Sequence, residues 1–150
     1  MKSEILDQYL LAAENFYKLA KSFDENQLKR TPEENEWSGA FIIHHLADFE
    51  IHFSHRIIRI LTEDNPLIES YDESLYAESL SYVNRDIGVS LDSIIANRKL
   101  IHGILAESQE SALDRPAVHS VKGDIKLRNL LQSCTGHLND HAEQLKAAVN

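Results

Sequence analysis

Four long stretches of the sequence carry apolar residues at steps of three and four positions. They span about residues 3–22, 38–61, 85–108 and 125–149, and short polar or turn-rich segments separate them. This spacing aligns the apolar side chains along one face of an α-helix, and no run of alternating β-branched residues competes with it. Because each helix must bury its apolar face against other helices, the sequence predicts an all-α fold, an antiparallel four-helix bundle.

The breaks between the predicted helices differ in regularity. Residues 66–84 have the least regular pattern, and we expect either a short helix over about 72–82 or an ordered excursion across one end of the fold. The break at 112–123 contains Pro116, and Asp124 is expected to cap the last helix. Because 150 residues are about the length of one domain, we expect residues 1–150 to form a single domain.

The charge balance restricts the class of partner. The chain has 24 acidic and 15 basic residues, a net charge of −9, which argues against nucleic acid and anionic membranes as partners. No apolar run is long enough to span a membrane. The single cysteine, Cys134, excludes an intramolecular disulfide, and the charged start of the sequence does not resemble an export signal, so we expect a cytoplasmic protein. A small molecule is the expected substrate.

Histidine is unusually frequent, and two of the eight stand one turn apart in the last predicted helix. His137 and His141 continue the apolar stripe that contains Leu130, Cys134 and Leu145, so both imidazoles point into the bundle. An unpartnered buried polar group costs about 1–3 kcal/mol. The two imidazoles therefore either bond to other protein groups or bind a metal ion, which would need a third ligand. Cys134 is expected to be a small buried hydrophobe rather than a ligand.

The second predicted helix offers that third ligand. His45, Asp48, His52 and His55 follow one another at steps of three and four, so they share one helical stripe. We favour His45, with His52 as the reserve; His44 lies about 100° around the helix and is expected at an interface or at the surface. Asp48 is the candidate catalytic residue, either orienting an imidazole or shuttling a proton, with a plain surface or hydrogen-bonding role as the alternative.

Two common metal motifs do not fit this chain. In metalloprotease helices a glutamate follows the first histidine, whereas here Leu138 follows His137. Di-iron bundles need Glu-x-x-His on two helices, and no histidine here has a glutamate three residues before it. A mononuclear three-histidine site with open coordination positions remains.

Two ordered segments resemble the DinB-like superfamily. The first is Trp37-Ser38 followed by His45-Leu46-Ala47-Asp48 and Glu50, and the second is Gly136-His137-Leu138-Asn139-Asp140-His141 followed by Gln144-Leu145. The stretch 123–131 also matches what precedes the last helix of the family. The resemblance spans about residues 3–148.

The resemblance implies a fold, a metal and a type of chemistry. It implies a four-helix bundle with a long connection between helices two and three, often as a homodimer. It implies a divalent ion, zinc or nickel, held by His45, His137 and His141. Characterised relatives are thiol-dependent transferases and isomerases, which implies a low-molecular-weight thiol such as bacillithiol, mycothiol or glutathione as co-substrate.

Two functional hypotheses follow. Three neutral imidazoles leave a bound ion its full charge, so the site can activate water or bind a thiol as thiolate. Our leading hypothesis is therefore a metal-dependent enzyme, a transferase or a hydrolase. The alternative is a non-catalytic, metal-stabilised bundle that binds a small ligand or a protein; a fourth protein ligand would favour it.

Overall fold

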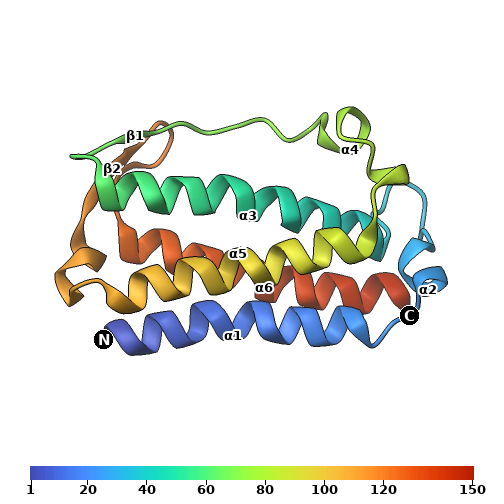
Figure 1. Ribbon diagram of the computed structural model, residues 1–150. Coiled ribbons are helices and arrows are strands. Elements are labelled where there is room, and N and C mark those ends of the chain that lie inside the picture. The colour runs from blue at the N-terminus through green and yellow to red at the C-terminus, as the bar shows by residue number, and fades with distance from the viewer.

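The computed structural model describes all residues, 1–150, and four long helices form its body (Figure 1). These helices are α1 (Lys2–Lys21), α3 (Gly39–Thr62), α5 (Ile87–Glu107) and α6 (Leu127–Val149). They confirm the predicted four-helix bundle, and the helix boundaries lie within two residues of the expected ones. No helix is long and apolar enough to cross a membrane.

The long connection between α3 and α5 determines how the helices run. In Figure 1 it returns along the length of α3, so that α3 and α5 start at the same end of the bundle, whereas α1 and α6 start at the other. The parallel course of α3 and α5 brings His44 beside Ser90 and Glu50 beside Arg98. Helices α3 and α5 are therefore antiparallel to α1 and α6; α1 packs against α5, and α6 packs against α3.

Side chains cap the starts of two long helices. The Ser38 hydroxyl accepts a hydrogen bond from the Phe41 backbone N–H and caps α3, and the Asp86 carboxylate accepts from the Val89 backbone N–H and caps α5. The expectation that Asp124 caps the last helix is wrong, because Asp124 lies in a β-strand. Helix α6 starts three residues later, where Asn129 accepts from the Lys126 backbone N–H.

A small three-stranded sheet, which no sequence pattern predicted, fixes the long connection to the turn before α6. Its strands are β1 (Leu67–Ile68), β2 (Pro116–His119) and β3 (Gly123–Lys126). Strand β2 is central: it pairs in parallel with β1 and as an antiparallel hairpin with β3, where Gly123 takes a positive φ of 77°.

The irregular stretch 66–84 contains two further short elements. These are α4 (Tyr76–Ser79) and η1 (Tyr82–Asn84); α2 (Glu25–Lys29) and η2 (Glu110–Asp114) lie in the other breaks. A short helix was thus expected in the right place, but the segment also runs along α3 rather than only over one end (Figure 1).

A buried ion pair separates the two halves of the hydrophobic core. Arg98 of α5 is fully buried and donates from Nε to both carboxylate oxygens of Glu50, at 2.9 Å each. Its two Nη atoms donate to the backbone carbonyls of Tyr9 in α1, at 2.7 Å, and Cys134 in α6, at 2.9 Å. One side chain therefore links all four long helices at mid-height.

Candidate metal centre

Three imidazoles from two helices converge inside the bundle. Nε2 of His137 lies 3.4 Å from Nε2 of His45 and 3.0 Å from Nε2 of His141. All three ligand atoms lie within 4.8 Å of one another. Two nitrogens bound to one zinc ion at about 2.0–2.1 Å in tetrahedral geometry would be roughly 3.4 Å apart. The two distances from His137 therefore lie close to the spacing expected around one shared ion.

The hydrogen-bond partners of the Nδ1 atoms of His141 and His45 indicate which ring nitrogens are free to bind a cation. Nδ1 of His141 lies 2.6 Å from Oε1 of Gln144, and Nδ1 of His45 lies 3.3 Å from a carboxylate oxygen of Glu73. Because both partners are acceptors, each Nδ1 carries the proton and each Nε2 presents a lone pair to the centre. Lone pairs facing one another repel, and a metal ion satisfies them.

Burial keeps the imidazoles in the neutral form that binds metals. Burial, and then the nearby His141, lower the pKa of His45 to about 4. Burial and the imidazoles of His141 and His45 lower the pKa of His137 to about 3. Burial also lowers the pKa of His141, which the hydrogen bond to Gln144 partly opposes. All three are therefore neutral at pH 7.

Aromatic rings pack around the imidazoles. The Phe49 ring stacks on His137 with ring centres 3.9 Å apart, and the Trp37 ring lies 5.1 Å from that of His45. A hollow of about 230 Å³ reaches His137 from outside, and Glu73 forms part of its wall. Aromatic rings thus cover two sides of the cluster, and of the three histidines His137 is the one that lines the hollow.

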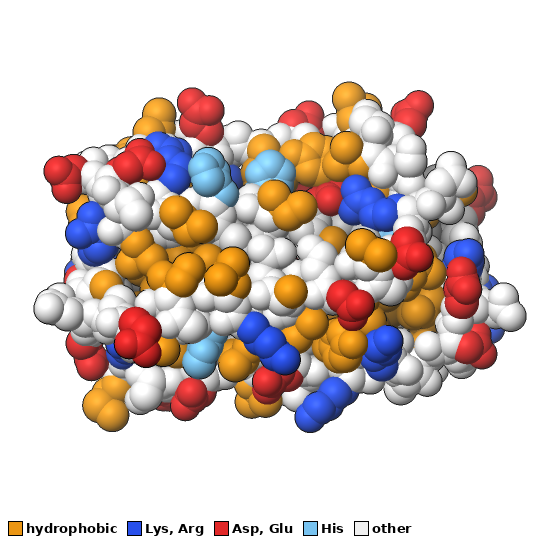
Figure 2. Space-filling model, viewed as in Figure 1, with side chains coloured by type: hydrophobic (Ala, Val, Ile, Leu, Met, Phe, Trp, Pro, Cys, Tyr) orange, Lys and Arg blue, Asp and Glu red, His pale blue; other side chains and the backbone are white.

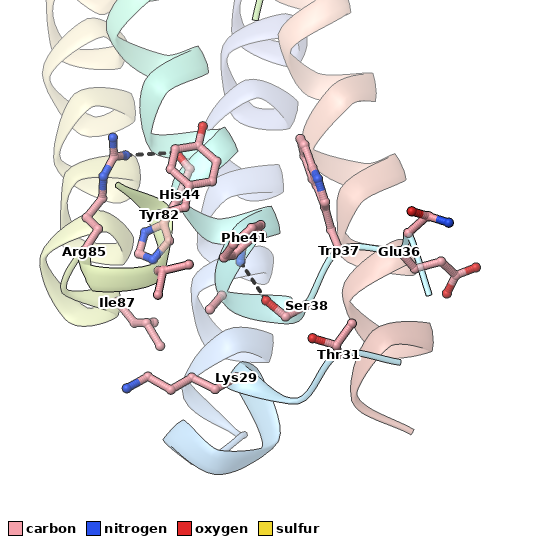
Figure 3. A pocket seen from close by; sticks show the side chains of 13 residues that line it. Lys29, Thr31, Glu36, Trp37, Ser38, Phe41, His44, Tyr82, Arg85 and Ile87 are labelled. Atoms are coloured by element: carbon pink, nitrogen blue, oxygen red, sulfur yellow. Dashed lines mark hydrogen bonds between the residues drawn. The ribbon is translucent and has the colours of Figure 1, made fainter. Parts of the chain in front are cut away.

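A second hollow, of about 520 Å³, lies on the other side of Trp37 (Figure 3). Figure 3 shows Tyr82 and Arg85 across from Trp37, with Lys29 below them. None of the three clustered histidines lines this hollow, so it is separate from the metal centre.

The structure gives Asp48 partners other than the imidazoles. Its carboxylate accepts from the Tyr82 hydroxyl at 2.6 Å and from Nη1 of Arg85 at 2.8 Å. It makes no hydrogen bond to His45, and Glu73 occupies the Nδ1 side of that ring instead. Asp48 therefore holds η1 and the start of α5 against α3.

The remaining histidines lie outside the cluster. His44 was expected at an interface or at the surface, and the latter is wrong: it is fully buried, with Nδ1 2.8 Å from the Ser90 hydroxyl. His52, the reserve ligand, bonds instead to the Tyr76 hydroxyl at 2.9 Å and stacks on Tyr71. His55 is exposed. Cys134 is buried in the apolar core, as expected.

The family comparison agrees with this arrangement. The family model of the DinB superfamily matches residues 8–145. The chain belongs to the DinB superfamily. The predicted membership is confirmed, and the match includes all three clustered histidines.

Relatives of this DinB-superfamily chain have names that refer to metal-dependent hydrolysis. A "putative metal-dependent hydrolase" of Halalkalibacterium halodurans is 28% identical over 131 residues, which cover 87% of this chain and 76% of the relative. One of Oceanobacillus iheyensis is 29% identical over 127 residues, covering 82% of this chain and 73% of the relative.

Solved structures show the same fold. YfiT from Bacillus subtilis, described as "a probable metal-dependent hydrolase with an unusual four-helix bundle topology", superposes with a TM-score of 0.86 at 22% identity, covering 97% of this chain and 83% of YfiT. The DinB-like protein YjoA from Bacillus subtilis gives a TM-score of 0.65 at 18% identity, covering 97% and 90%.

Proposed function

We propose that this chain is a hydrolase that uses one divalent metal ion held by His45, His137 and His141. The observation that carries the proposal is the convergence of three Nε2 atoms, in which Nε2 of His137 lies 3.0 Å from that of His141 and 3.4 Å from that of His45. The hydrolase names of the relatives support the reaction class. Zinc and nickel are the ions we propose, since imidazole suits both.

The ion would supply a nucleophile at neutral pH, because three neutral ligands leave its charge undiminished and lower the pKa of bound water to about 7. The protein's own part is orientation. Gln144 and Glu73 hold the rings of His141 and His45, and such outer partners raise ligand basicity and fix the tautomer. Glu73 also faces the 230 Å³ hollow, where its carboxylate can hold a proton beside the substrate.

The same centre supports thiol transfer as a second candidate. An all-imidazole ligand set keeps the ion's positive charge, which favours binding of a low-molecular-weight thiol as thiolate. We propose Asp48 as a positioning residue in either reaction, because it holds the connection that carries Glu73 through Tyr82 and Arg85.

Elemental analysis of untagged protein tests the metal centre. We expect about one divalent ion per chain in the wild type and loss of that ion in His137→Ala. His55→Ala is the matched control, since His55 is an exposed histidine of the same helix as His45 and lies outside the cluster. Full metal content in a folded His137→Ala protein would refute the ligand assignment.

Turnover assays separate the two reactions and the non-catalytic alternative. Wild type, His137→Ala and His55→Ala are tested on activated esters, with and without glutathione-type thiols and an electrophile. Metal-dependent ester hydrolysis without thiol supports the hydrolase, and thiol-dependent product supports the transferase. Full metal occupancy without turnover on either panel would favour the metal-stabilised binding module. The homodimer stays a prediction, which analytical ultracentrifugation tests.

A further inference from the structure

A buried arginine near the metal centre has no carboxylate partner. Only two arginines are buried, and Arg98 is paired with Glu50. Arg56, 8% exposed, has no acidic group within ion-pair distance, although the chain has an excess of acidic residues. Its one hydrogen bond runs from Nη2 to the backbone carbonyl of Glu69 at 2.7 Å. A buried charge without a counter-charge is costly, so an unpaired one indicates a missing anion.

A ladder of stacked rings connects this arginine with the metal centre. The Arg56 guanidinium lies over the Phe53 ring at 4.6 Å, Phe53 stacks on Phe49 at 3.9 Å, and Phe49 stacks on His137 at 3.9 Å. All four residues line the 230 Å³ hollow. The hollow therefore has a metal-binding end, an apolar middle and a cationic end.

Two further donors come from the small sheet. His119 accepts at Nδ1 from the backbone N–H groups of Val121 and Lys122, both at 3.1 Å, so its proton is on Nε2, which has no partner within the protein. Lys122 is exposed, makes no ion pair, and lines the hollow together with His119. Strand pairing of β1 with β2, and a bond from the Ser70 N–H to the Ser120 hydroxyl at 2.9 Å, hold this turn in place.

We propose that the substrate of this site is a small molecule with a carboxylate or phosphate group, which Arg56 binds together with His119 and Lys122. Its apolar part lies along Phe49 and Phe53, and its reacting group lies at His137. This substrate class rests on the proposed metal-dependent function, but the anion subsite itself is formed by groups that bind no metal. A guanidinium fork and fixed N–H donors are the usual partners of both anions.

Calorimetric titration of the protein as purified tests the subsite. The probes are inorganic phosphate and acetate, with acetamide as a neutral match for acetate. The variants are Arg56→Gln and, as control, Arg59→Gln, because Arg59 is on the same helix, is paired with Glu63 and lies outside the hollow. We expect both anions to bind the wild type and Arg59→Gln, acetamide to bind neither, and Arg56→Gln to lose tenfold or more in anion affinity.

The outcomes separate this subsite from the metal centre. Phosphate binding stronger than acetate binding would assign a phosphate substrate, and the reverse a carboxylate. If the purified protein holds no metal, the proposed function fails; anion binding that still depends on Arg56 in that protein would uphold the subsite. Metal-replete protein in which Arg56→Gln binds both anions like the wild type would overturn the subsite alone. Thermal melting checks that the variants are folded. If Arg56→Gln is unfolded, Arg56→Lys replaces it, because lysine keeps the charge but lacks the forked guanidinium.

Discussion

Replacing Arg98 with methionine is expected to destabilise the fold by about 3–5 kcal/mol, because it leaves a buried carboxylate without its counter-charge. Glu50 is 1% exposed, so water cannot take the place of the guanidinium. The backbone carbonyls of Tyr9 and Cys134 lose their donors in the same variant. This loss is a large fraction of the roughly 5–15 kcal/mol typical of a whole domain.

The assay is thermal and urea unfolding at several pH values. For a chain of this length the expected loss lowers the melting temperature by about 10 °C or more. Burial raises the pKa of Glu50 above its ordinary 4.5, opposed in the wild type by Arg98. Without Arg98 the folded pKa rises further, and a raised carboxyl pKa means that stability is lost as pH rises through it. The deficit of Arg98→Met should therefore grow between pH 5 and pH 8.

Two further variants make the reasoning refutable. Arg59→Met breaks an exposed pair with Glu63 and is expected to change the melting temperature little. Arg98→Met combined with Glu50→Leu removes both charges and should recover most of the loss. A melting temperature of Arg98→Met close to that of the wild type, without pH dependence, would refute the linking role of this pair.

Three other predictions concern the metal centre and its surroundings. Glu73→Gln should weaken metal affinity about tenfold, since outer partners of ligating imidazoles have effects of that size, and competition with a chelator measures it. Metal-free protein should lose stability as pH falls from about 6.5 towards 4. The buried imidazoles have pKa values of about 4 at His45 and about 3 at His137, so the unfolded chain takes up protons before the folded one. Urea titrations at pH 7, 5.5 and 4 that coincide would contradict this prediction. Burial raises the pKa of the Cys134 thiol to about 12, so iodoacetamide should alkylate it only in the unfolded protein, and reaction at the same rate in native protein would count against its burial.

The sequence was sufficient for the features that depend on periodicity. The four amphipathic stretches gave the helices, because an apolar face can be buried in few other ways. The step of four between His137 and His141 placed both rings on one face, and the structure brings His45 to them. The Ser38 cap follows from local chemistry alone.

Other features depend on contacts that leave no pattern in the sequence. Strands of two to four residues are too short to show alternation, so the sheet was missed and Asp124 was misplaced. Glu73 lies in a segment without periodicity, and Arg98 resembles a surface residue until its three helical neighbours surround it. His44 was misjudged because α3 is buried on more than one side: α5 and α6 pack against it, and α4 and η1 of the connection also contact it. Figure 2 shows one face of the molecule, on which acidic and basic side chains lie around and between hydrophobic ones.

The position of the only tryptophan has a practical consequence. Trp37 is the sole indole in the chain, and its ring lies 5.1 Å from that of His45. Any change in charge or ligation at this imidazole therefore alters the surroundings of the only strong chromophore in the protein. Its intrinsic fluorescence is an optical reporter of the histidine cluster that needs no label, and its emission can be recorded during metal titration on unmodified protein.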